Sequence, residues 1–171
     1  MGIGFIGLGN MARAIIGGIV SAQDICGSAK TRKTLDAVHR EYGIEVNSSN
    51  SAVAAQSQTL VLAVKPQFLE EVIREIRDAV RPDTLIISIA AGKSLNWLEE
   101  AFGGKRKLVR CMPNTPALVG EGCTGVCVNG AVSEEETRYS LSLMESFGKA
   151  SLVEERLMDA VGAVSGSSPA Y

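Results

Sequence analysis

Short apolar runs alternate with helical patterns along this chain, and the alternation constrains the fold more than any other feature. The run Thr59–Val64 is apolar throughout, as a strand covered on both faces requires. The next segment, 67–80, places Phe68, Val72, Ile76 and Val80 on one stripe, as expected for a helix that packs on a sheet. Further strands are predicted at Ile3–Ile6, Ile25–Gly27, 43–46, 84–92, 107–112 and 122–130. The expected fold class is therefore α/β, a Rossmann-like doubly wound sheet that is mainly parallel, with helices on both faces.

Composition excludes several classes of protein. The 171 residues suit one domain, and a net charge of −2 without charge clusters argues against nucleic acid or an anionic membrane as a partner. One histidine, His39, argues against a His/Cys zinc cluster and a serine triad, and no metal is expected. The four cysteines form neither a C-x-x-C pair nor a disulfide framework. We expect Cys123 and Cys127 to be buried free thiols.

We do not expect the N-terminal segment to act as a targeting signal. It lacks a basic region before its apolar run, and Arg13 interrupts that run. Position six is Ile6, whereas myristoylation requires Ser or Thr there. No apolar run approaches membrane-spanning length. We expect a soluble, cytoplasmic protein.

A glycine motif follows the first predicted strand directly and opens a helix. It reads Gly7-x-Gly9-x-x-Ala12. In dinucleotide-binding proteins the first glycine permits the tight turn, the second lets a pyrophosphate approach the backbone, and a small third residue lets helix and strand pack. The pyrophosphate would then lie at the helix N-terminus. The alternative is a plain turn, but the strand–turn–helix context favours dinucleotide binding.

The end of the second predicted strand favours NADPH over NADH. An NAD site has an acidic residue about 20 residues after the glycine motif, where it bonds the ribose 2′-hydroxyl. Residues 25–33 contain no acid, and Ser28, Lys30, Thr31 and Arg32 offer hydroxyls and cations instead. That composition suits a 2′-phosphate. The alternative is an ordinary solvated loop.

Five stretches together resemble the pyrroline-5-carboxylate reductase family. They are GFIGLGNMA near the N-terminus, AVKPQ at 63–67, AAGKS at 90–94, RCMPNTPALVGEG at 110–122 and SGSSPAY at 165–171. The resemblance spans the chain, and MPNTPALVGEG is its most specific part. It implies an oxidoreductase of proline biosynthesis that transfers a hydride from NADPH to the C=N bond of 1-pyrroline-5-carboxylate. It also implies a homo-oligomeric enzyme in which NADH would bind more weakly.

The resemblance also implies which residues bind ligands, and no catalytic residue follows from it. The substrate contacts would be Asn114, Ser167 and Ser168, although Asn114 could equally cap a turn. Lys65 could be a solvated flanking lysine. The cofactor contacts would be Gly7, Leu8, Gly9, Asn10, Met11, Ser28, Ala29, Lys30, Asn50, Val64, Lys65, Pro66 and Ala91.

The last residues resemble the joint between the family's cofactor domain and a second, helical domain. We therefore expect residues 1–163 to form the NADP-binding domain and residues 164–171 to be the joint. Ser168 stands where the family usually has glycine. A chain that lacks the helical domain is expected to bind NADPH but to reduce the imine poorly.

Two other functions stay open. The N-terminal motif also resembles β-hydroxyacid dehydrogenases, although MPNTPALVGEG does not. A non-catalytic module that binds NADPH is the second alternative.

Overall fold

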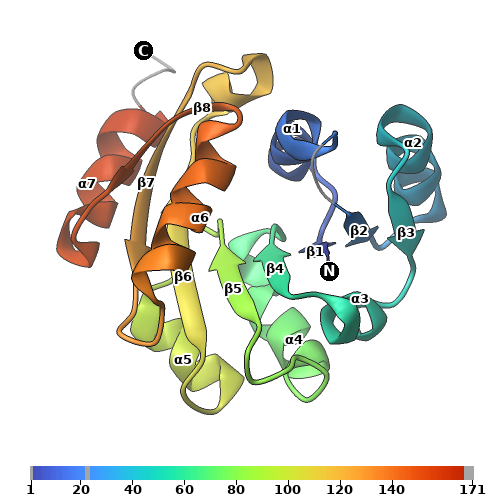
Figure 1. Ribbon diagram of the computed structural model, residues 1–171, viewed down its shortest axis with the longest axis horizontal. Helices are drawn as coiled ribbons and strands as arrows, with labels where there is room; N and C mark the ends of the chain where they lie inside the picture. The colour runs from blue at the N-terminus through green and yellow to red at the C-terminus, as the bar shows by residue number, and fades with distance from the viewer. Residues whose placement is uncertain (1, 22–23, 168–171) are drawn as a thin grey trace.

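The computed structural model describes residues 2–21 and 24–167, and its strands form a mixed eight-stranded sheet (Figure 1). The strand order is β3-β2-β1-β4-β5-β6-β7-β8. The strands are β1 (Ile3–Ile6), β2 (Ile25–Ser28), β3 (Glu45–Asn47), β4 (Thr59–Leu62), β5 (Leu85–Ser88), β6 (Lys107–Met112), β7 (Gly122–Val128) and β8 (Gly148–Leu152). The predicted α/β, doubly wound and mainly parallel class is confirmed.

Helices connect most of these strands. The α-helices are α1 (Asn10–Ile19), α2 (Arg32–Tyr42), α3 (Asn50–Gln56), α4 (Pro66–Ile76), α5 (Leu95–Phe102), α6 (Glu134–Glu145) and α7 (Met158–Val161). Shorter helical turns are η1 (Thr115–Val119), η2 (Glu155–Leu157) and η3 (Gly162–Ser167), of which η3 is π-helical. Among the described residues, no helix has both the length and the apolar character needed to cross a membrane.

Two strands, β7 and β8, run against the other six. β7 pairs with β6 in the antiparallel sense, whereas the remaining pairs are parallel. Only η1 and short loops separate β6 from β7, and a parallel crossover needs a dozen or more residues, usually with a helix. α6 supplies such a crossover between β7 and β8, so these two strands are parallel.

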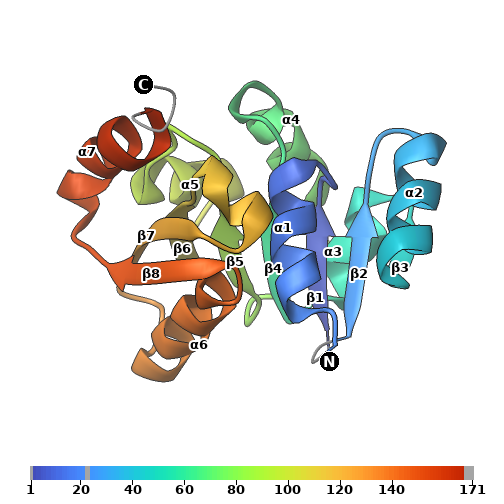
Figure 2. The same cartoon turned by 90° about the horizontal axis from the view of Figure 1, so that it is seen from above.

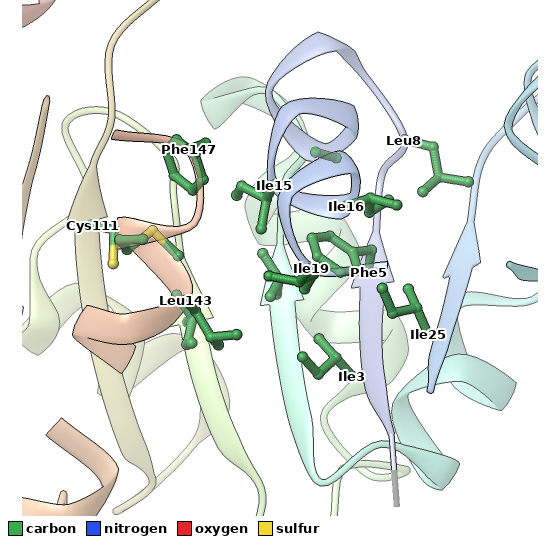
Figure 3. Close-up of a cluster of buried hydrophobic side chains, with 14 of the residues drawn as sticks. Ile3, Phe5, Leu8, Ile15, Ile16, Ile19, Ile25, Cys111, Leu143 and Phe147 are labelled. Carbon is green, nitrogen blue, oxygen red and sulfur yellow. The ribbon is translucent and has the colours of Figure 1, made fainter. Parts of the chain in front are cut away.

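Each face of the sheet carries its own apolar core. On one face, Ile3 and Phe5 of β1 belong to a core that also contains side chains of α1, α2 and α6. Figure 3 shows part of this core, with Ile3 and Phe5 beneath α1. On the other face, Ile6 and its neighbours pack against α3, α4, α5 and α7. Figure 1 shows α1 and α4 on opposite sides of the central strands, and in Figure 2 α1 lies in front of them. Because successive strand residues point to opposite faces, the apolar runs of β1, β4 and β5 supply both cores.

The helix ends follow local sequence signals. Ser94 accepts a hydrogen bond from the backbone N–H of Trp97 and caps α5. Ser133 and Glu136 form a reciprocal capping box at the start of α6. Gly148 lies three residues after the end of this helix and does not cap it. α6 ends at Glu145, and Gly148 begins β8 with a φ of 153°, where its Cα lies against β7.

The predicted burial of the cysteines is correct for Cys127 and wrong for Cys123, which is exposed. The last residue of β6, Met112, pairs with Gly125. β7 therefore continues past the end of β6 at Cys123, where β8 alone pairs with it. The apolar segment around Cys123 does not reveal where the neighbouring strand stops.

Candidate functional site

The glycine motif lies at the carboxyl ends of β1 and β4, where the strand order reverses. Such a point is where open α/β sheets bind ligands. Gly7 has a φ of +94°, and its N–H donates to the carbonyl of Ser28 at 3.0 Å. A methyl group on Gly7 would lie 2.8 Å from the carbonyl oxygen of Ala63. The turn therefore depends on a glycine both for its backbone conformation and for the close approach of β4.

Gly9 has a different role from Gly7. It is the N-cap of α1, with an ordinary φ of −77° and no side chain to cap the helix. A methyl group on Gly9 would meet no atom within 4 Å. The space beside Gly9 and the first N–H groups of α1, which have no partner inside the helix, are therefore open to a ligand. The dipole of α1 favours an anion there, and no acidic residue lies in its first turn.

A cavity of about 760 Å³ begins at this loop and extends over the ends of β1, β2 and β4. Four segments line it. They are the glycine loop and α1 (Gly7, Leu8, Gly9, Asn10, Arg13), the end of β2 and α2 (Ser28, Ala29, Lys30, Thr34), the start of α3 (Ser48, Asn50), and the β4–α4 segment (Val64, Lys65, Phe68, Glu71, Val72, Glu75).

Both charge signs occur in this cavity. Arg13, Lys30 and Lys65 contribute positive charge, while Glu71 and Glu75 on α4 contribute negative charge. The guanidinium of Arg13 donates from Nε to the carbonyl of Leu8 at 3.2 Å, which holds it beside the glycine loop. The positive charges thus lie along the loops after β1, β2 and β4, and the carboxylates lie on the α4 wall.

Ser28 and Asn50 are joined by a hydrogen bond. Ser28 is fully buried, and its hydroxyl donates to Oδ1 of Asn50 at 2.7 Å. The amide of Asn50 in turn donates from Nδ2 to Oε2 of Glu75 at 2.9 Å. The hydroxyl that the sequence offered to a 2′-phosphate is therefore directed at Asn50. Thr31, another of these residues, caps α2 through its own hydroxyl.

Most of the cofactor contacts that the resemblance implied line the cavity, and three do not. Met11 packs against the core beneath α1. Pro66 is the first residue of α4, the position where a missing N–H is tolerated. Ala91 is exposed on the loop between β5 and α5, outside the cavity lining.

Asn114 holds together three segments of the chain. Its Oδ1 accepts from the backbone N–H of Cys123 at 2.8 Å, and its Nδ2 donates to Ser165, 3.0 Å from the hydroxyl and 3.2 Å from the carbonyl. The side chain is 8% exposed. These bonds join the loop after β6 to β7 and to η3. Ser167 ends η3, and Ser168 lies outside the described residues.

The sequence did not predict the α4 wall, because the expected apolar stripe placed Phe68 with the residues that pack on the sheet. Leu69, Ile73 and Ile76 are buried in the core, whereas Phe68 is 49% exposed and lines the cavity with Val72. The predicted stripe is therefore correct for Ile76 and Val80, which are in the core, and for Val72, which packs partly against it, and it is wrong for Phe68. The spacing of Leu69, Ile73, Ile76 and Val80 also fits one helix face and was the available signal.

The site's geometry agrees with a family match. A family model described as NADP oxidoreductase, coenzyme F420-dependent, matches residues 2–92, which contain the glycine loop and the α4 wall. The chain belongs to this family.

Relatives extend the similarity over the rest of the chain. Pyrroline-5-carboxylate reductase of Escherichia coli is 41% identical over 174 aligned positions, which cover 99% of this chain and 65% of that enzyme. The solved structure of the Coxiella burnetii enzyme superposes with a TM-score of 0.95 at 34% identity, covering 99% of this chain and 65% of that one. The resemblance predicted from the sequence motifs is confirmed, and the chain spans just under two thirds of these relatives.

The similarity includes a structure with a ligand. The Plasmodium falciparum pyrroline carboxylate reductase, solved with NADP bound, has a TM-score of 0.86 and 33% identity, covering all of this chain and 64% of that one.

Proposed function

We propose that this chain is the NADPH-binding part of a pyrroline-5-carboxylate reductase. The observation that carries the proposal is the open space beside Gly9 at the N-terminus of α1, where a pyrophosphate can reach backbone N–H groups. The cavity that begins there has walls from the loops that follow β1, β2 and β4, as a dinucleotide requires. The NADP-bound relative from Plasmodium falciparum supports the same cofactor.

The residues that would hold the cofactor divide by location. The loop Gly7–Asn10 would hold the pyrophosphate, and Lys30 with Thr34 would face the 2′-phosphate end. Lys30 is an exposed cation on the cavity, and residues 25–33 contain no acid. Repulsion of a 2′-phosphate is therefore absent from this part of the wall, and NADPH should bind more tightly than NADH.

When bound, NADPH supplies the hydride that reduces the C=N carbon of 1-pyrroline-5-carboxylate, and with one proton on nitrogen the product is proline. A protonated imine is already an electrophile, so the protein's main contribution is to align two rings at contact distance. The described residues are consistent with a reaction that needs no strong acid–base pair. The cavity holds no histidine or cysteine, and its carboxylates belong to the α4 wall.

The remaining expectations stay predictions. The substrate contacts of Asn114, Ser167 and Ser168 are proposed, and the bonds of Asn114 to Cys123 and Ser165 give it a structural role in the described conformation. The division at residue 163, a homo-oligomer and a cytoplasmic location are also proposed rather than observed.

Two assays test the function. The chain is mixed with NADPH and 1-pyrroline-5-carboxylate, and in parallel with NADP and a β-hydroxyacid, while absorbance of the reduced nicotinamide is followed. We expect NADPH binding with little imine reduction by this chain alone, and imine reduction when it is joined to the C-terminal third of a relative. Turnover of the hydroxyacid but not the imine would instead favour a β-hydroxyacid dehydrogenase. Binding with no turnover in the joined protein would favour a non-catalytic module.

A further inference from the structure

Three polar side chains beside the cavity form a hydrogen-bond chain with a defined direction. Ser28 donates to Oδ1 of Asn50, and Nδ2 of Asn50 donates to Glu75. An ionised carboxylate only accepts hydrogen bonds, so the Asn50 amide must present its NH₂ group to Glu75 and its oxygen to Ser28. The hydrogen-bond chain therefore fixes which way the amide points.

The orientation matters because Asn50 lines the cavity. An NH₂ group has two hydrogens, and Glu75 takes one of them. The second is a donor that remains for a ligand. If the amide turned over, its oxygen would face the Glu75 carboxylate, and the two acceptors would repel each other. Glu75 therefore disfavours the orientation in which Asn50 would offer an oxygen to an anionic ligand.

Glu75 is itself held in place by the start of α3. Its backbone carbonyl accepts from the hydroxyl of Ser51 at 3.1 Å, while its carboxylate accepts from the neighbouring Asn50. Two consecutive residues of α3 thus contact one residue of α4: Ser51 holds the backbone of Glu75, and Asn50 holds its carboxylate.

The negative charge of Glu75 is unexpected in a cavity that binds an anion. A carboxylate on the wall of a cavity that takes an anion repels that anion, so on charge alone it opposes binding. We propose that Glu75 is a positioning residue: it orients Asn50 so that the amide donates to an oxygen of the bound dinucleotide. This inference rests on the proposed binding of NADPH.

Two substitutions of Glu75 separate the effect of its side-chain length from the effect of its charge. Glu75→Gln keeps the length and an acceptor oxygen but removes the charge. Glu75→Asp keeps the charge but shortens the side chain by one methylene. We expect Glu75→Asp to weaken NADPH binding about tenfold, the usual scale for one hydrogen bond to a charged group. Glu75→Gln should tighten binding less than Glu71→Gln does, because a glutamine amide can donate as well as accept and no longer fixes the Asn50 amide.

Glu71 provides the matched control, since it carries the same charge one turn earlier on the same cavity wall. We expect Glu71→Asp to leave NADPH affinity unchanged. If Glu75 acts only through its charge, Glu75→Gln and Glu71→Gln will tighten binding alike and Glu75→Asp will change nothing. That pattern would overturn the proposal.

A double-mutant cycle tests whether Glu75 acts through Asn50. Asn50→Ala should weaken NADPH binding, and adding Glu75→Asp to it should cause no further loss. Additive losses would contradict a positioning role.

Two measurements without cofactor show whether each variant is folded and whether the surroundings of Asn50 have changed. The unfolding midpoint in urea shows whether each variant is folded, and the side-chain ¹⁵N–H signals of Asn50 should shift in Glu75→Asp while those of other asparagines stay. Unchanged Asn50 signals would overturn the proposal. Failure of the wild-type chain to bind NADPH would overturn the proposed function as well, whereas binding without coupling would overturn only the role of Glu75.

Discussion

Gly7 and Ala63 approach so closely that a methyl group on Gly7 would lie 2.8 Å from the Ala63 carbonyl oxygen. This contact fixes the glycine loop against the end of β4. Because Gly7 also has a φ of +94°, we expect Gly7→Ala to destabilise the chain by about 1–3 kcal/mol. Urea unfolding measures the loss. Gly43→Ala is the control, since Gly43 has a positive φ but its added methyl group would meet no neighbour within 4 Å. Equal losses in the two variants would show that the contact with Ala63 contributes nothing.

Glu155 stabilises the attachment of the C-terminal segment to the sheet. It lies 3.3 Å from the guanidinium of Arg110, whose side chain is 8% exposed, and it accepts from the backbone N–H of Leu95 at 2.7 Å. Because Glu155→Ala leaves a buried cation with only the exposed Asp159, we expect a loss of about 1–3 kcal/mol in urea unfolding. Asp159→Asn should cost less than about 1 kcal/mol. A larger effect from Asp159→Asn would contradict this account.

The stabilising effect of Glu136 should be lost in acid. Burial alone would raise its pKa, but hydrogen bonds from Lys107 Nζ at 2.6 Å and from the backbone N–H of Ser133 outweigh burial and hold the pKa below its ordinary value. Its stabilisation is therefore present above the ordinary value of about 4.3 and lost as pH falls through the lower folded value.

Glu136→Gln should lose less stability than wild type as the pH falls. Urea unfolding midpoints of both proteins at pH 7, 4 and 3 measure this difference. At neutral pH the substitution should cost about 1 kcal/mol, because the pair with Lys107 is partly exposed. Glu135→Gln, in the same exposed first turn of α6, is the control. An identical acid slope in wild type and Glu136→Gln would argue against this role.

One thiol should react quickly in the folded chain. Cys123 is exposed, whereas Cys26, Cys111 and Cys127 are buried. Burial, with a contribution from Glu155, raises the pKa of Cys127 to about 11, so little reactive thiolate forms at pH 8. A thiol-reactive dye at pH 8 should therefore label one cysteine rapidly, and Cys123→Ser should remove that phase. Unfolded chain should show all four thiols. A fast phase that persists in Cys123→Ser would contradict the described burial.

The sequence predicts the fold well because its signals are local. The apolar run of β4, the glycine turn at Gly7 and the caps at Ser94 and Ser133 each need only neighbouring residues to be recognised. The resemblance to the family also implied ligand contacts in the loops after β1, β2 and β4, and these loops line the cavity. These parts of the site follow from strand order alone, since carboxyl ends of parallel strands share one edge of the sheet.

The rest of the site depends on tertiary placement. Apolar residues occur on both sides of α4, so the spacing of Leu69, Ile73 and Ile76 allows a core face but does not show that Phe68 meets the cavity. The partner of Asn50, Glu75, lies 25 residues away on another helix, and the partner of Asn114, Ser165, lies 51 residues away. A single sequence carries no signal for such pairs.

The measurement that tests the central claim most directly is calorimetric titration of this chain with NADPH and with NADH, repeated for Gly9→Ala. Gly9 has an ordinary φ and open space at its Cβ, so the substitution should leave the unfolding midpoint unchanged and still block the approach of a pyrophosphate. We predict that NADPH binds more tightly than NADH and that Gly9→Ala loses most of the affinity for both. Wild-type affinity in folded Gly9→Ala, or no binding of NADPH to wild type, would contradict a dinucleotide site at this loop.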